Sequence, residues 1–167
     1  EFRRVLFRSS RNVKLTDTLN KTIIKGNYAE IFKALDSAMI TKRSLAIKMV
    51  DRDSLYIKAD TLFAIGPTEN RIIKGRYNVK FYKKNLSGRA DKIIINQKSG
   101  LTKLQRKPLS KREKQILTSK EISKRNPIIW NGESQMTGDE IRILRNIKTN
   151  DLDSLKILNN AFVTEKD

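Results

Sequence analysis

The residue types that carry most protein chemistry are scarce in this 167-residue chain. It has no Cys and no His, so it lacks a thiol nucleophile, a disulfide, and the commonest general base and metal ligand. Carboxylates remain, and four of them recur in one short motif: a small residue or Thr, then Asp, any residue, and Leu or Ile. The four are Asp17, Asp60, Asp91 and Asp139.

None of these Asp residues stands in the cluster of oxygen ligands that a calcium loop requires. The chain also lacks the G-x-G-x-x-G and G-x-x-x-x-G-K-[ST] loops that cradle nucleotide phosphates. Catalysis by carboxylates alone remains possible, but no candidate pair stands out, and we expect a protein that is not an enzyme and that needs no metal and no cofactor. The repeated Asp residues are expected to face solvent or to turn the strands.

Net charge is the stronger chemical signal. The chain carries 36 Lys and Arg against 18 Asp and Glu, a formal charge of +18. Such a surface favours anionic partners: nucleic acid, an acidic lipid surface or a phosphorylated glycolipid. The plainer alternative is a lysine-rich, solvated surface. No apolar stretch approaches the ~18 residues of a membrane helix, so we expect no transmembrane segment.

The densest basic stretch is the segment 103–126, with nine Lys or Arg and two Glu. Ser110 and Glu113 have the spacing of a capping box, and the residue before Pro127 is disfavoured in a helix. We expect a basic insertion between two strands that contains a short helix. Either an anion-binding arm or a solvated loop fits it; the loop is preferred, because aromatic residues for base stacking are lacking.

Period-two alternation dominates the rest of the chain. The segment Ile23-Ile24-Lys25-Gly26-Asn27-Tyr28 returns as Ile72-Ile73-Lys74-Gly75-Arg76-Tyr77, and both copies continue as alternating runs. Repeated strand-turn-strand units indicate stacked β-structure. We predict an all-β fold, an antiparallel twisted β-jelly-roll over residues 12–102 and 127–163, with any helix confined to 103–126.

Each predicted strand shows one apolar stripe. Spacing predicts that the stripes line a single face, whose members are Leu45, Ile47, Leu55, Ile57, Phe63, Ile73, Tyr77, Val79, Phe81, Trp130, Ile143, Leu155 and Ile157.

The first nine residues, EFRRVLFRS, match the translation of a common sequencing adapter. We expect them to be an artefact and the native domain to occupy residues 10–167. On this interpretation the coding region is cut at a contig end, both natural termini are in doubt, and a signal peptide would have been lost.

The repeated strands, and above all the run NPIIWNGESQMTGDEI at residues 126–141, resemble the OstA-like family of organic-solvent-tolerance proteins, in its Bacteroidetes form. These proteins are related to the periplasmic lipopolysaccharide-transport protein A. The resemblance covers roughly residues 12–163 and implies an open-ended β-jelly-roll whose apolar interior shields the acyl chains of lipid A. It implies no catalytic residues.

The resemblance also implies a place in the periplasm of a Gram-negative bacterium, associated with outer-membrane assembly. The thirteen apolar residues above would then line a lipid trough, and lipopolysaccharide would be the partner. Unpaired sheet edges would join other transport jelly-rolls by strand addition. Two alternatives remain open: a basic nucleic-acid-binding β-domain, although we expect no nucleic acid, and a ligand-free structural β-solenoid segment.

Overall fold

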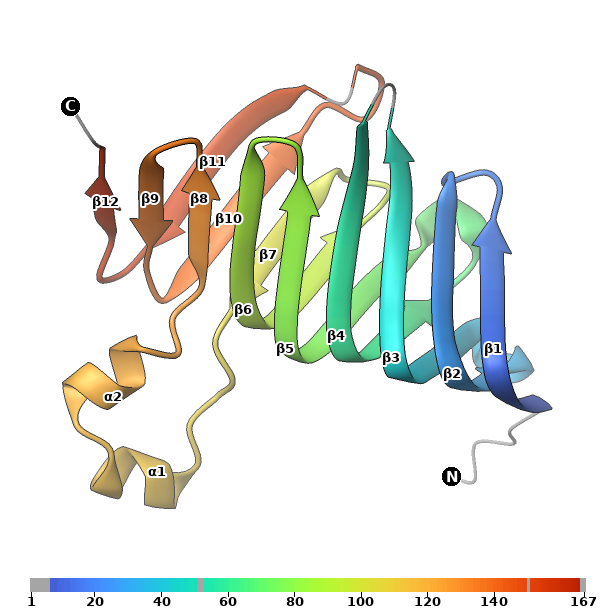
Figure 1. The fold of residues 1–167 in the computed structure, drawn as a ribbon, viewed down its shortest axis with the longest axis horizontal. Coiled ribbons are helices and arrows are strands. Elements are labelled where there is room, and N and C mark those ends of the chain that lie inside the picture. The colour runs from blue at the N-terminus through green and yellow to red at the C-terminus, as the bar shows by residue number, and fades with distance from the viewer. Residues whose placement is uncertain (1–6, 51–52, 150, 166–167) are drawn as a thin grey trace.

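A computed structural model describes residues 7–50, 53–149 and 151–165. In these residues twelve strands form one sheet (Figure 1). The first six strands are long: β1 (Phe7–Asp17), β2 (Thr22–Phe32), β3 (Ser37–Val50), β4 (Asp53–Ile65), β5 (Ile72–Lys83) and β6 (Leu86–Asn96). The others are shorter: β7 (Leu101–Gln105), β8 (Ile128–Asn131), β9 (Ser134–Thr137), β10 (Glu140–Arg145), β11 (Leu152–Leu158) and β12 (Phe162–Thr164).

All strand pairs are antiparallel, which confirms the predicted all-β class and its jelly-roll-like form. Strands β1 to β7 follow one another as a meander, and β10 and β11 continue the same sheet. A solenoid of stacked parallel coils does not describe this topology. The only elements besides strands in the described residues are short: the 3₁₀ turns η1 (Lys33–Leu35) and η2 (Thr68–Asn70), and two helices.

The long strands bend near their middle, where the pairing register shifts between each two neighbours from β1 to β6. Such shifts are β-bulges, which sharpen the local twist and turn a strand through a corner. In β3 the bulge residues Lys42 and Arg43 have positive φ, and in β5 Tyr77 and Asn78 do. A corner therefore runs across the sheet and divides it into two leaves.

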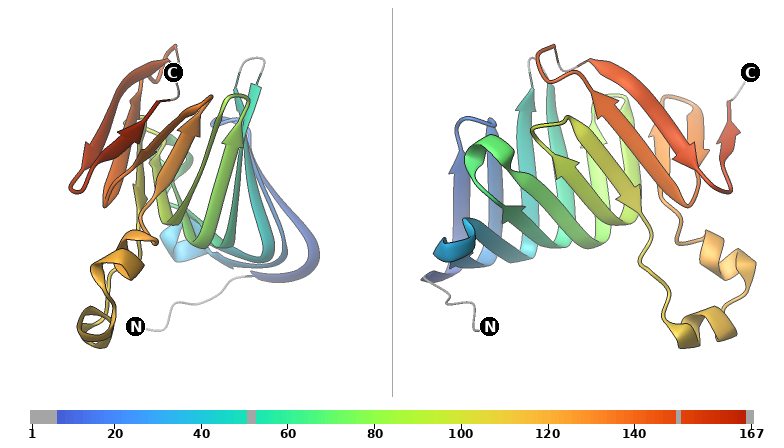
Figure 2. Two further views of the ribbon diagram at one scale, coloured as in Figure 1. Left: turned by 60° about the vertical axis from the view of Figure 1, so that its left-hand side comes forward. Right: turned by 180° about the vertical axis from the view of Figure 1, so that it is seen from behind.

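We call the leaves front and back. The front leaf holds the halves of β1–β6 that meet at the β1–β2, β3–β4 and β5–β6 hairpins, together with β8, β9 and β12. The back leaf holds the other halves with β7, β10 and β11. Strand β6 belongs to both, because one half pairs with β8 and the other with β7. The leaves meet at the bend and diverge toward the opposite edge (Figure 2).

The repeated I-I-K-G segment marks strands that cross this bend. Gly26 in β2 and Gly75 in β5 both face the interior, and a Cβ there would lie 2.5 Å from Ile40 and 2.7 Å from Ile93 respectively. Glycine is required because side chains of the adjacent strands, Ile40 of β3 and Ile93 of β6, occupy the space on the inner side of the corner. The two copies run through the bend in opposite directions, since β2 leads from front to back and β5 from back to front.

The core fills the middle of the space between the leaves. Its fully buried side chains come from both: Ile57 from the front leaf, Ile40, Leu62 and Leu104 from the back leaf, and Ile129 from β8. Burying a side chain of this size contributes about 1.5–3 kcal/mol each. The interior is therefore a packed core at its centre, and larger open spaces lie toward one end and toward the open edge.

The basic insertion leaves the sheet between β7 and β8 and carries both α-helices of the described residues, α1 (Lys111–Ile116) and α2 (Ser119–Ser123). The prediction that any helix is confined to 103–126 is confirmed for α-helix and wrong for the short 3₁₀ turns η1 and η2. Its predicted start is wrong by three residues, because 103–105 pair as part of β7. The predicted capping box at Ser110 and Glu113 is present, and Thr118 and Glu121 form a second one. At the base of this arm Arg106 donates to Asn126 at 2.8 Å and to Asp139 at 3.0 Å.

The cap of helix α1 should persist to low pH. The backbone N–H of Ser110, the Arg125 guanidinium and the Ser110 hydroxyl lower the pKa of Glu113 to about 2. A lowered carboxyl pKa stabilises the folded form above pH ~4.5, and this contribution is lost as the pH falls toward 2. We expect a side-chain NMR titration of Glu113 with a midpoint well below the ordinary carboxyl value of 4.5, together with loss of the α1 amide signals at that midpoint. A midpoint of ~4.5 would contradict the observed cap.

The adapter-like residues are only partly described. Residues 1–6 lie outside the described residues, but 7–9 form the start of β1, where Phe7 pairs with Ile31 and Arg8 lies 3.3 Å from Glu30. Residues 7–9, expected to be an artefact, thus form part of β1 in the structure.

Candidate functional site

A cavity of about 400 Å³ lies between the leaves at the β1–β3 end, and we call it the end cavity. Its apolar wall is built from both leaves, with Leu15 and Ile24 from the front and Ile31, Ala38 and Ile73 from the back. These side chains meet here because alternation turns them inward on either side of the bend. The volume falls within the roughly 300–1,000 Å³ typical of small-molecule sites.

The rim of the end cavity is polar and charged. Arg71, which precedes β5, lies 3.4 Å from the carboxylate of Asp17 at the end of β1, so an ion pair joins the two leaves. Asn20 donates to Asp17 at 2.8 Å and to the Thr68 carbonyl at 2.8 Å, which adds a second link across the same gap. The rim also includes Lys33 and Asp36. An apolar wall beneath a charged rim suits an amphiphile.

Eight of the thirteen residues predicted to share one apolar face do so. They are buried, or partly buried against the core, between the two leaves: Leu55, Ile57, Ile73, Val79, Phe81, Ile143, Leu155 and Ile157. Among these eight, Ile73 also lines the end cavity. The others form the packed centre or small spaces within it, so the structure assigns most of the predicted face to the core.

The common-face prediction is wrong for five residues. Leu45 and Ile47 lie on the outer face of β3, because their pairing partners Lys58 and Tyr56 alternate with the buried Ile57. Phe63 lies outside because the bulge in β4 inverts the alternation and places Leu62 inward.

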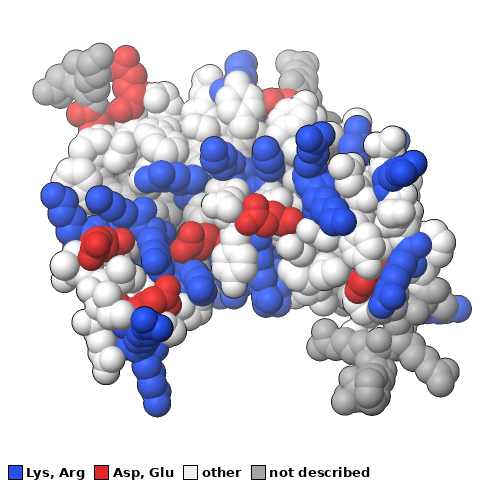
Figure 3. All heavy atoms as spheres, turned by 60° about the horizontal axis from the view of Figure 1, so that its bottom comes forward, with Lys and Arg blue, Asp and Glu red and all other residues white. Residues whose placement is uncertain are grey.

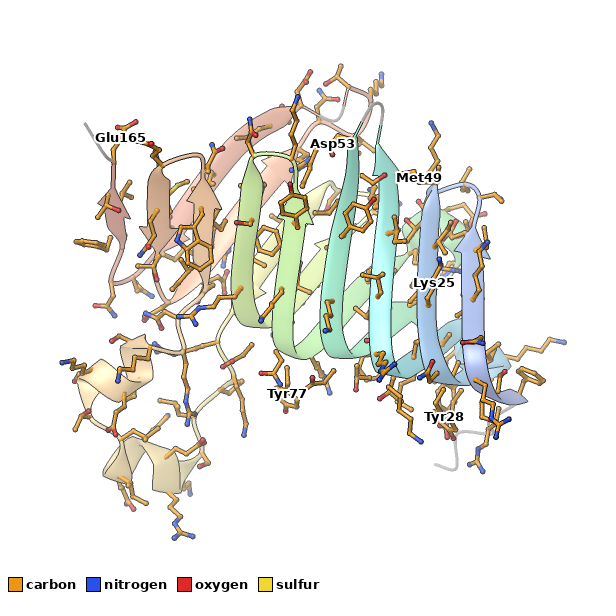
Figure 4. All side chains as sticks on the ribbon, in the orientation of Figure 1. Lys25, Tyr28, Met49, Asp53, Tyr77 and Glu165 are labelled. Carbon is orange, nitrogen blue, oxygen red and sulfur yellow. The ribbon has the colours of Figure 1, made fainter. Side chains whose placement is uncertain are left out.

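Tyr77 and Trp130 are the other two. Tyr77 sits at the bend, 48% exposed, and points away from the space between the leaves (Figure 4). Trp130 faces outward because Ile129 is the buried residue of β8, and its indole N–H donates to Gln135 at 3.0 Å.

Sequence reasoning missed most of the end-cavity wall. Leu15 alternates with polar residues in β1, but Ile24 follows Ile23 and Ile31 precedes Phe32, so in β2 the alternation is less clear. Their common location depends on the bend, which brings the two halves of β2 face to face.

The four repeated Asp residues have a shared structural role. Asp17 accepts from Asn20, Asp60 from Asn78, and Asp91 from the backbone N–H of Lys107. Asp139 accepts from Arg106, Asn126 and Asn160. The carboxylates therefore fix turns and corners, as expected of residues that turn the strands, and some of them also join separate elements.

The outer face of the front leaf carries a row of like charges. Pairing places Lys14 opposite Lys25, and Lys80 between Lys58 and Arg89, with Leu45 filling the remaining position. All five cations are exposed. Like charges directly opposite on neighbouring strands destabilise a sheet. Figure 3 shows Lys and Arg in bands across the molecule with fewer acidic side chains among them.

Two further observations concern the described residues. They hold no group of three or more Asp or Glu arranged to bind a metal ion. In the same part of the chain, no helix has the length and apolar character needed to cross a membrane.

Comparison with known proteins adds no relative. A scan against protein-family models and a search of curated proteins each found no match to this chain.

Proposed function

We propose that this protein is a non-enzymatic module that binds and shields the acyl chains of lipopolysaccharide between its two leaves. The observation that carries the proposal is the end cavity: about 400 Å³, walled by aliphatic side chains from both leaves and rimmed by Arg71, Lys33, Asp17 and Asp36. An acyl chain requires an apolar surface shielded from water. The rim carries two cations, Lys33 and Arg71, and two carboxylates, Asp17 and Asp36, so attraction to the phosphates of lipid A comes from the strongly basic chain as a whole.

The two ends of the sheet support a role in a chain of modules. Among the described residues, β1 pairs only with β2 at one end, and β11 and β12 each have one partner strand at the other. Strand edges of this kind pair with further strands by β-augmentation. We propose that other jelly-roll modules add there, so that their lipid-binding spaces follow one another across the periplasm toward the outer membrane.

Photo-crosslinking tests the lipid proposal. A photoreactive residue at Ile31, in the cavity wall, should capture lipopolysaccharide in a Gram-negative cell, whereas the same residue at Phe63, on the outer face, should not. Replacing Ala38 by Phe should reduce capture at Ile31 several-fold, because the larger ring fills the cavity. Ala38 is 8% exposed, so the melting temperature of this variant must be measured alongside.

The proposal is tested by the difference in lipopolysaccharide capture between Ile31 and Phe63. Equal capture at Ile31 and Phe63 would show surface attraction and contradict binding between the leaves. The same crosslinker at Lys80 gives a second outer-face control, in a residue of the exposed cation row.

Single-stranded nucleic-acid binding is the second candidate, and one observation favours it. Tyr56 and Tyr82 are directly opposite each other on the outer face, 43% and 56% exposed, beside the cations Lys58 and Lys80. Aromatic platforms with flanking cations bind single strands. Phe81, in contrast, is buried and offers no platform. Salt-sensitive binding of oligothymidylate that is lost in Tyr56→Ser, without any lipid capture at Ile31, would favour this candidate over the lipid proposal.

A further inference from the structure

Two cations face inward at the open edge of the space between the leaves. Lys48 in β3 and Arg145 at the end of β10 both line a pocket of about 70 Å³, which we call the mouth pocket. Lys48 comes from the front leaf and Arg145 from the back leaf, so the cations approach from opposite sides. A water molecule occupies about 30 Å³ in the liquid, so the mouth pocket has the volume of about two waters. This is enough room for a single phosphate group.

Neither side chain forms an ion pair with a carboxylate of the described residues. Lys48 donates to the neutral Gln97 side chain at 3.2 Å. Burial lowers the pKa of Lys48, and the charge of Arg145 lowers it further, although Asp17 acts in the opposite direction. Burial also lowers the pKa of Arg145. Two partly buried like charges without an anion are an unfavourable arrangement that an anionic ligand would relieve.

The mouth pocket adjoins the end cavity on both leaves. On the front leaf Lys48 pairs directly with Thr22, which lines the end cavity. On the back leaf Ile95 of the mouth pocket pairs with Ile73 of the end cavity. A headgroup between the two cations would therefore lie beside the place where an apolar chain fits.

We propose that Lys48 and Arg145 bind a phosphate group carried by an acyl or alkyl chain, with the chain in the end cavity. Gln97 holds the Lys48 ammonium in position, and the guanidinium of Arg145 offers a planar fork of donors to the phosphate oxygens. This inference rests on the proposed lipid-binding function and assigns its headgroup specificity.

Calorimetric titration of the purified chain with three probes tests the site: dodecyl phosphate, dodecyl maltoside and inorganic phosphate. We expect dodecyl phosphate to bind at least 10-fold more tightly than dodecyl maltoside, which has the same chain and a neutral head. Lys48→Gln and Arg145→Gln should each weaken dodecyl phosphate binding at least 10-fold and leave dodecyl maltoside unchanged. Lys48→Arg, which keeps the charge, should stay within about 3-fold of the native protein.

The matched control is the double variant Lys58→Gln, Lys80→Gln, which removes two exposed cations from the outer face and should leave dodecyl phosphate binding unchanged. Equal loss in this control and in Lys48→Gln would overturn the site and indicate surface attraction.

The remaining outcomes separate the two proposals. If both amphiphiles bind equally and the Lys48 and Arg145 variants change neither, the headgroup site is overturned while lipid binding stands. If the native protein binds neither amphiphile, the proposed function fails as well. Inorganic phosphate that binds as tightly as dodecyl phosphate, with the same sensitivity to both variants, supports the phosphate site and identifies the free ion as its ligand.

Discussion

Replacing Leu104 by Ala should lower the free energy of unfolding by about 2–5 kcal/mol, the range for a large aliphatic residue removed from a packed core. Leu104 is fully buried in β7 and pairs with Ile93 on β6 and Ile141 on β10, which are themselves buried. A loss of about 3 kcal/mol corresponds to a melting temperature lower by roughly 6–12 °C for a domain of this size. Urea denaturation gives the free energy directly.

The control for Leu104 lies in the arm between β7 and β8. Ile116 in α1 is 63% exposed, and its replacement by Ala should change stability by less than about 0.5 kcal/mol. Equal losses for the two variants would show that β7 does not belong to the core, and that the basic segment begins at residue 103 after all.

Replacing Arg71 by Met should destabilise the protein by about 2 kcal/mol, less than the roughly 3–5 kcal/mol for breaking a fully buried ion pair. The Asp17 side chain is 8% exposed and that of Arg71 19% exposed, so removal of the guanidinium leaves a largely buried carboxylate supported only by Asn20. The same change removes the ion pair that joins the leaves above the end cavity. We therefore expect faster amide hydrogen exchange at η2, where Arg71 also donates to the Gly66 carbonyl and the Thr68 hydroxyl, and in the β1–β2 hairpin.

A double-mutant cycle isolates this pair. Asp17→Asn with Arg71→Met should recover part of the loss, since no buried charge then remains. The matched control is Arg142→Met, whose partner Glu140 is on the same strand and whose side chain is 43% exposed. Its loss should stay below about 1 kcal/mol. An Arg71 variant as stable as the Arg142 variant would show that the rim pair does not hold the leaves together.

The sequence alone determined the strands, their antiparallel order and the place of the helical arm. Alternation in β4, β5 and β6 is strong because one face of each strand packs against the core while the other meets water. The capping box at Ser110 and Glu113 is equally local, since its hydrogen bonds join residues three apart. Local patterns of this kind survive in the fold because they depend on near neighbours in the chain.

The tertiary structure decided which face of each strand is inside. In β3 both faces carry apolar residues, and the larger pair, Leu45 and Ile47, suggested the core face; the close leaves instead admit Ser44 and Ala46. The bulges invert the alternation halfway along β4, which moves Phe63 outward. The register and the bend result from packing between residues of the two leaves that are far apart in the sequence. No local pattern therefore specifies them.

The candidate sites depend on the same long-range packing. The wall of the end cavity includes Ile24 and Ile31, which lie in opposite halves of β2. The ion pair at its rim joins Asp17 to Arg71, 54 positions apart in the sequence. Lys48 appeared in the sequence as one Lys among many in a strongly basic chain. Only the fold turns it inward to face Arg145, because alternation about the buried Ala46 and the bend of the sheet together set its direction.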